Sequence, residues 1–122
     1  MYLVGRDPAL KATAQRQVER LFSNRERLVT DAEVLQEILH RYTLIKRPDA
    51  IQAAFDVLLG FVDEVFAIDL ATVERAKQIV LGYPRLSVRD AIHAAVMQRE
   101  GIGRILTFDA EFDGLPGITR IG

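Results

Sequence analysis

Short apolar runs alternate with longer amphipathic segments along this chain, and this alternation constrains its fold more than any other feature. The runs cover residues 27–30 (RLVT), 64–68 (EVFAI) and 104–108 (RILTF), with a weaker fourth at 117–121 (GITRI). Each has the length and composition of a buried strand. Because helices separate the strands, the connections must be crossovers, which predicts an α/β fold with a mainly parallel sheet and helices on both faces.

Helix-start signals define the segments between the strands. We expect helices over residues 8–22, 32–42, 47–62, 70–80 and 87–100. Their expected N-caps are Asp7, Thr30 or Asp31, Asp69 and Ser87, while Pro8 and Pro48 lie near helix starts. Gly101 is expected to end the last of these helices.

Composition limits the function. The length of 122 residues suits one domain, and 49% hydrophobic residues can form a sizeable core. With 16 basic and 17 acidic residues, no global basic field attracts nucleic acid, so such a site must be local or use bound cations. The absence of cysteine excludes disulfides and thiolate metal sites and fits a reducing cytosol. Neither a membrane span nor a signal peptide is expected, so we expect a cytoplasmic protein.

Three acidic residues are the candidates for a functional site. Ligands bind at the carboxyl ends of parallel strands, and Asp109 directly follows residues 104–108. Glu37 lies two turns into the helix that follows residues 27–30, and Asp90 lies in the first turn of its own helix. Clustered carboxylates are the ligands that Mg²⁺ and Mn²⁺ prefer. We therefore expect the three carboxylates to converge on one crevice.

Structural roles compete with this hypothesis. Ser87 and Asp90 fit a capping box, and Asp109 could cap a short turn, although an N-terminal carboxylate can cap and coordinate together. On a helical wheel, Glu37 lies roughly 130° from the centre of the apolar face formed by residues 34, 35, 38, 39 and 42. Glu33 lies roughly 170° from it, so Glu33 is expected to point to solvent.

Other catalytic chemistries have little support. His40 and His93 are the only histidines, and we interpret His93, one turn after Asp90, as a packed or hydrogen-bonded residue. The sequence contains no nucleophile elbow, Walker A motif or dinucleotide fingerprint. Basic residues that could contact phosphate are more simply read as solvated surface; they are Arg41, Lys46, Arg47 and Arg89.

Three segments of the chain, taken in order, resemble the PIN-domain family, and most of all its VapC-type toxins. They are LVTDAEVLQEILHRY, LSVRDAIHAAVMQREGI and RILTFDAEFDGLPGITRI. The resemblance covers nearly the whole chain from about Gly5. It implies a three-layer α/β/α fold and RNA cleavage that depends on Mg²⁺ or Mn²⁺. It matches Glu37, Asp90 and Asp109 to the family's catalytic, metal-binding acids. Asp113 is a possible extra acid, and Thr107 matches a small hydroxyl residue near the site.

The same resemblance implies partners: an RNA substrate, a small antitoxin that covers the acidic groove, and commonly a second copy of the chain. It also exposes a difference. The family opens with a strand that ends in an aspartate, and MYLVGRDPAL looks like the stretch after that strand. Asp7, before Pro8, is no substitute. We therefore expect the sheet to lack a central strand, whether because the chain starts inside the domain or because it is a natural variant. A non-catalytic or truncated PIN-like module that binds an antitoxin is the alternative.

Overall fold

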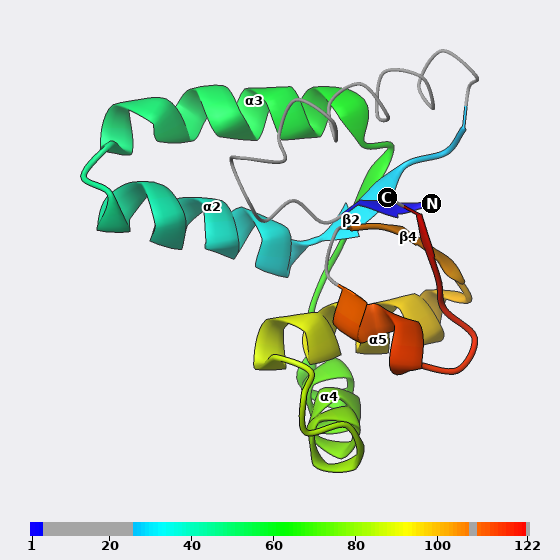
Figure 1. Ribbon diagram of the computed structural model, residues 1–122. Helices are drawn as coiled ribbons and strands as arrows, with labels where there is room; N and C mark the ends of the chain where they lie inside the picture. Colours follow the sequence, from blue (N-terminus) through cyan, green and yellow to red (C-terminus); the bar gives the residue numbers. More distant parts are fainter. Residues whose placement is uncertain (4–25, 108–109, 122) are drawn as a thin grey trace.

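A computed structural model describes residues 1–3, 26–107 and 110–121 of the chain (Figure 1). The predicted helix over residues 8–22 lies outside the described residues. The elements are, in order, β1 (Tyr2–Leu3), β2 (Val29–Asp31), α2 (Ala32–Leu44), η2 (Pro48–Ala50), α3 (Ile51–Phe61), β3 (Glu64–Phe66), α4 (Leu70–Gly82), α5 (Val88–Glu100), β4 (Arg104–Leu106), η3 (Ala110–Gly114) and β5 (Thr119–Ile121). All four predicted strands are present, each shorter than its apolar run.

The strands form one sheet in the order β3-β2-β1-β4-β5, and every pair is parallel. The predicted α/β class is therefore confirmed. The connection from β2 to the neighbouring β3 crosses over through α2, η2 and α3, as parallel pairing requires. The carboxyl ends of all five strands consequently lie at the same edge of the sheet.

Alternating side chains of the short strands enter two different cores. Tyr2, Val29 and Ile105 join a large cluster with residues of α4 and α5. Their neighbours Leu3, Leu28 and Leu106 face the other way and pack with the end of α3. Successive side chains of a strand point to opposite faces, so helices cover both faces. This confirms the three-layer arrangement.

The caps are largely those that the sequence predicts. Asp31 caps α2, because one of its oxygens accepts hydrogen bonds from the backbone N–H groups of Glu33 and Val34. Asp69 caps α4 through the N–H of Thr72. Gly101 ends α5 in the left-handed conformation, with φ of 69°.

The expectation that the sheet lacks its central strand is wrong. Tyr2 and Leu3 form β1 between β2 and β4, with Tyr2 opposite both Val29 and Ile105 and Leu3 opposite Leu106. Both residues are buried. Two residues are too few to show the period-2 pattern that identifies a strand from sequence. The described part of this strand carries no carboxylate, and the residues that follow it lie outside the described residues.

Helices α2 and α3 pack against each other and extend away from the sheet, whereas α4 and α5 pack together on its other side (Figure 1). Only Val34 of the predicted apolar face of α2 is buried, and Leu39 is exposed. The start of α2 touches the sheet, and its later turns lie beyond it. Within the described ranges, no helix is long and apolar enough to cross a membrane.

Candidate functional site

Glu37 and Asp90 come from two helices that meet near the carboxyl edge of the sheet. Asp90 is buried in the first turn of α5, where the Ser87 hydroxyl accepts a hydrogen bond from its backbone N–H at 3.1 Å. The structure thus confirms the Ser87 cap. Glu37 is in the second turn of α2, and its side chain is only 10% exposed. A carboxylate this well covered, on a helix that is mostly exposed, needs specific partners.

His93 is the buried link between these helices. Its Nδ1 lies 2.7 Å from Oδ2 of Asp31, and its Nε2 lies 3.3 Å from Oε1 of Glu37. The imidazole and the Asp31 carboxylate are both fully buried. The Tyr2 hydroxyl donates a hydrogen bond to the same Asp31 oxygen. Asp31 therefore connects β1, the end of β2 and α5 at one point.

These contacts determine the charge of His93. Burial by itself lowers the pKa of His93, but hydrogen bonds to Asp31 and Glu37 and their negative charges outweigh it and raise the pKa to about 9. Carboxylate oxygens only accept, so a ring with a proton on each nitrogen satisfies both contacts. The interpretation of His93 as a hydrogen-bonded residue agrees with this geometry.

Two further charged groups border Glu37. The Nε atom of Arg89 lies 3.8 Å from Glu37 Oε1, and its side chain is 41% exposed. Glu33, one turn earlier on α2, is half-buried rather than directed fully to solvent, so that expectation is wrong in part. Burial and the nearby negative charge of Glu37 raise the pKa of Glu33. Glu33 lies close to Glu37 and to the sheet because it is in the first turn of α2, which begins at the buried Asp31 cap.

The other predicted site residues, Asp109, Thr107 and Asp113, have three different outcomes. Asp109 lies outside the described residues, so the convergence of three carboxylates stays a prediction. Thr107 is buried directly after β4, and its N–H donates to the carbonyl of Ile121. Asp113 is exposed and forms an ion pair with Arg120 of β5, at 2.9 Å from its Nε. That pairing indicates a structural role for Asp113 in holding η3 against β5.

Sequence reasoning missed Asp31 as a member of this cluster. Its cap role was one of two alternatives, and capping uses only one carboxylate oxygen. The remaining signal was indirect: a buried strand end followed by an acid, and a histidine one turn after Asp90. Helix periodicity shows which residues share a face, but it does not show which residue of another helix they meet.

The donor chemistry fits a hard divalent cation. Glu37 and Asp90 supply carboxylate oxygens, which Mg²⁺ and Mn²⁺ prefer. Both contacts to Glu37 go to Oε1, and among the described residues Oε2 has no hydrogen-bond partner. No group of three histidine or acidic side chains within the described part of the chain could hold a metal ion.

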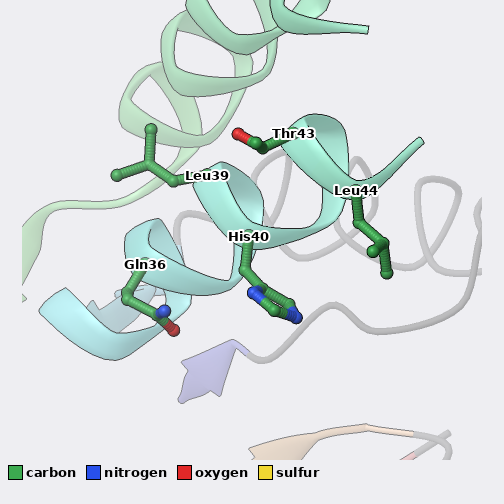
Figure 2. Close-up of a pocket in the computed structure, with 5 residues that line it drawn as sticks. All are labelled: Gln36, Leu39, His40, Thr43 and Leu44. Carbon is green, nitrogen blue, oxygen red and sulfur yellow. The ribbon is translucent and has the colours of Figure 1, made fainter. Parts of the chain in front are cut away.

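A groove of about 330 Å³ runs along the outer part of α2. Figure 2 shows Gln36, His40 and Leu44 along one side of the helix, with Leu39 and Thr43 beside them. Glu37 is not among the described residues that line the groove, and residues adjacent in sequence on a helix point in different directions. The described lining combines the polar residues Gln36, His40 and Thr43 with two exposed leucines, Leu39 and Leu44.

Comparisons with known proteins agree with this architecture. The family model described as the PIN domain matches residues 1–118. Ribonuclease VapC13 of Mycobacterium tuberculosis is 54% identical over 121 residues, which cover 99% of this chain and 92% of that protein. Ribonuclease VapC23 of the same species is 37% identical over 109 residues, with 89% and 86% covered.

Solved structures show the same fold. Mycobacterium tuberculosis VapC20, a sarcin-ricin loop cleaving toxin, superposes with a TM-score of 0.73 at 22% identity, covering 96% of this chain and 97% of that one. VapBC2 of Rickettsia felis, bound to promoter DNA, gives 0.72 at 14% identity, covering 98% and 96%. By the match of the family model over almost its whole length, and by its close relatives, this chain belongs to the PIN-domain family.

Proposed function

We propose that this chain is a divalent-metal-dependent endoribonuclease and the toxin of a toxin–antitoxin pair. The observation that carries the proposal is the pair of covered carboxylates, Glu37 and Asp90, on helices that meet beside the carboxyl edge of a parallel sheet. The 54% identity to a VapC ribonuclease over nearly the whole chain supports the substrate class.

Glu37, Asp90 and Asp109 would hold Mg²⁺ or Mn²⁺. When bound, such an ion activates water and stabilises the negative charge that develops on a phosphoryl oxygen. Asp90 is buried, and the Ser87 hydroxyl, which accepts from its backbone N–H, fixes the start of the helix that carries it. Arg89 is partly exposed beside Glu37, so its guanidinium is available to contact an RNA phosphate. With a net charge of −1, such local contacts and the cation must balance the phosphate charge.

We propose a small antitoxin as the protein partner. Solved structures with this fold include a toxin–antitoxin complex from Klebsiella pneumoniae. The groove on α2 includes two exposed leucines, Leu39 and Leu44, which offer apolar contacts to a segment of such a partner. A homodimer and a cytoplasmic location, where RNA is available, complete the proposal.

The test is cleavage of a structured RNA by the purified chain and by two matched variants. Asp90→Asn should lower the rate at least about a hundredfold, because replacing even a residue that only supports a metal ligand costs about 10–100-fold. Asparagine also tolerates a helix start, so folding should persist. Asp69→Asn is the control, because Asp69 also lies at a helix start, but on α4 and exposed. It should leave the rate unchanged, and EDTA should abolish cleavage by every form.

Two outcomes would contradict the proposal. Equal cleavage by all forms, insensitive to EDTA, would mean that the acidic cluster is not the catalyst. A folded chain that binds an antitoxin but cleaves no RNA with Mg²⁺ or Mn²⁺ would instead be a non-catalytic PIN-like module.

A further inference from the structure

The imidazole of His93 is held firmly on one side. Its Nδ1 contacts Asp31, whose other oxygen accepts from two backbone N–H groups of α2 and which also receives the Tyr2 hydroxyl. Asp31 is fully buried and cannot turn without breaking these bonds. The orientation of the ring is therefore fixed by β1 and by the start of α2. This fixes the direction of Nε2 as well.

The other side of the ring meets a side chain that is intrinsically mobile. Glutamate has three side-chain torsions, so its carboxylate keeps one position only where contacts hold it there. Its Oε1 has two neighbours in the described part of the chain: buried His93 Nε2 at 3.3 Å and the partly exposed Arg89 at 3.8 Å. The first is the contact within hydrogen-bonding distance, so His93 restrains the carboxylate more strongly.

His93 and Asp90 are neighbours on α5. Residues three apart on a helix lie on the same side, about 5–6 Å apart at Cβ. Arg89 and His93, four apart, both reach Glu37. The carboxylate of Glu37 is thus held over the turn of α5 that carries Asp90, with Oε1 occupied and Oε2 without a partner among the described residues.

We propose that His93 is a positioning residue that fixes Glu37 so that Oε2 stays available to a divalent cation. The inference rests on the proposed function in taking Glu37 as a metal ligand. His93 touches neither cation nor RNA, and acts only through Glu37. Loss of its Nε2 contact should weaken cation binding, whereas loss of its Nδ1 contact should mainly weaken the fold.

Two isosteric replacements separate these contacts. Asparagine places an amide near the Nδ1 position of histidine, and glutamine places one near the Nε2 position. His93→Asn should keep a donor to Asp31 and lose the contact to Glu37, while His93→Gln should do the reverse. If His93 only held α5 against the buried Asp31, His93→Gln would bind the cation more weakly than His93→Asn.

The primary readout is Mn²⁺ binding to the full chain without RNA, measured by electron paramagnetic resonance of the free ion. We expect His93→Asn to raise the Kd by about 10–100-fold and His93→Gln by less than about threefold. In a Glu37→Gln background, His93→Asn should add little, because the two residues act as one unit. Thermal unfolding in EDTA identifies any variant that fails to fold.

A second measurement needs no His93 variant. On titration of the unchanged chain with Mg²⁺, the ¹⁵N signal of His93 Nε2 should shift with the saturation of the site, and it should not shift in Glu37→Gln. Four results would each overturn the proposal. Two compare the forms: equal Mn²⁺ affinities for all of them, or weaker binding by His93→Gln than by His93→Asn. The other two concern the unchanged chain: no measurable Mn²⁺ binding, or an Nε2 signal that does not shift. If this pattern appears in a chain that cleaves no RNA, the positioning role stands and the ribonuclease proposal fails.

Discussion

At the scale of single residues, the charge on His93 links the acidic cluster to stability. The pKa of this imidazole is about 9 in the folded chain against an ordinary value of 6.5. A raised folded pKa stabilises the fold fully below the unfolded pKa, and the contribution is lost as the pH rises through the folded pKa. The free energy of unfolding in EDTA should therefore fall between pH 6.5 and 9, by at most about 3.5 kcal/mol. Urea unfolding at several pH values measures this.

The control for this pH dependence is His93→Gln, which cannot titrate. Its free energy of unfolding should be lower than that of the unchanged chain at pH 6.5. It should also depend less on pH between 6.5 and 9. An equally steep fall in His93→Gln would assign the effect to another group.

Lys46 is a second residue with a measurable consequence. It has a φ of 59°, although it is not glycine, and the N–H groups of Lys46 and Arg47 bond to the carbonyls of Thr43 and Tyr42. This is a Schellman helix end, whose left-handed position favours glycine. Lys46→Gly should raise the free energy of unfolding by about 0.5–1 kcal/mol, because it removes the left-handed strain. Lys46→Ala keeps that strain and should not stabilise, so equal stabilisation by both variants in urea unfolding would refute the argument.

At the scale of elements, α2 differs from an ordinary surface helix. Its exposed outer turns and the groove along them are available to a partner. If an antitoxin covers this groove, Leu44→Glu should weaken its binding at least tenfold, because a buried charge opposes apolar contact. The side chain of Leu44 is 72% exposed in the chain alone, so folding should persist.

Leu81 provides the matched control for Leu44. It is a leucine with 76% exposure, but it lies on α4, on the opposite side of the sheet. Leu81→Glu should bind a co-expressed antitoxin as the unchanged chain does, by titration calorimetry. Equal loss in both variants would exclude the groove as the specific docking surface.

The same helix shows where prediction of elements from sequence works and where it stops. Caps are local hydrogen bonds, so Asp69 and Ser87 could be assigned to helix starts in advance, and the cap of α2 could be narrowed to Thr30 or Asp31. The exposure of Glu33 and Leu39 could not be assigned. Helical periodicity defines a face, but only the packing of α2 against α3, away from the sheet, determines what that face meets.

At the scale of the whole molecule, the parallel sheet could be predicted from three apolar runs separated by helices. Its central strand, β1, could not be predicted. Tyr2 and Leu3 form no recognisable pattern, and their role depends on strands about 25 and 100 residues later in the chain. The candidate site divides in the same way. Asp90 and Glu37 were found by residue type and position, but the Asp31–His93–Glu37 connection requires two distant segments to meet: the start of α2 with its Asp31 cap, and α5.

The central position of β1 leads to a prediction for the whole fold. β1 lies between β2 and β4 and pairs with both, so without it the sheet divides into β3-β2 and β4-β5. Deletion of residues 1–3 should abolish cooperative unfolding, and the milder Leu3→Ala should cost about 2–3 kcal/mol, because Leu3 is buried between Leu28 and Leu106.

Leu81→Ala, at an exposed position, should change the free energy of unfolding by less than about 0.5 kcal/mol. Urea unfolding followed by circular dichroism measures all three variants. A cooperative transition of unchanged midpoint in the deleted chain would mean that β2 and β4 do not need β1 between them. The deletion also removes the Tyr2 hydroxyl that donates to Asp31, so an unchanged midpoint would further mean that this bond contributes little to the buried Asp31–His93 contact.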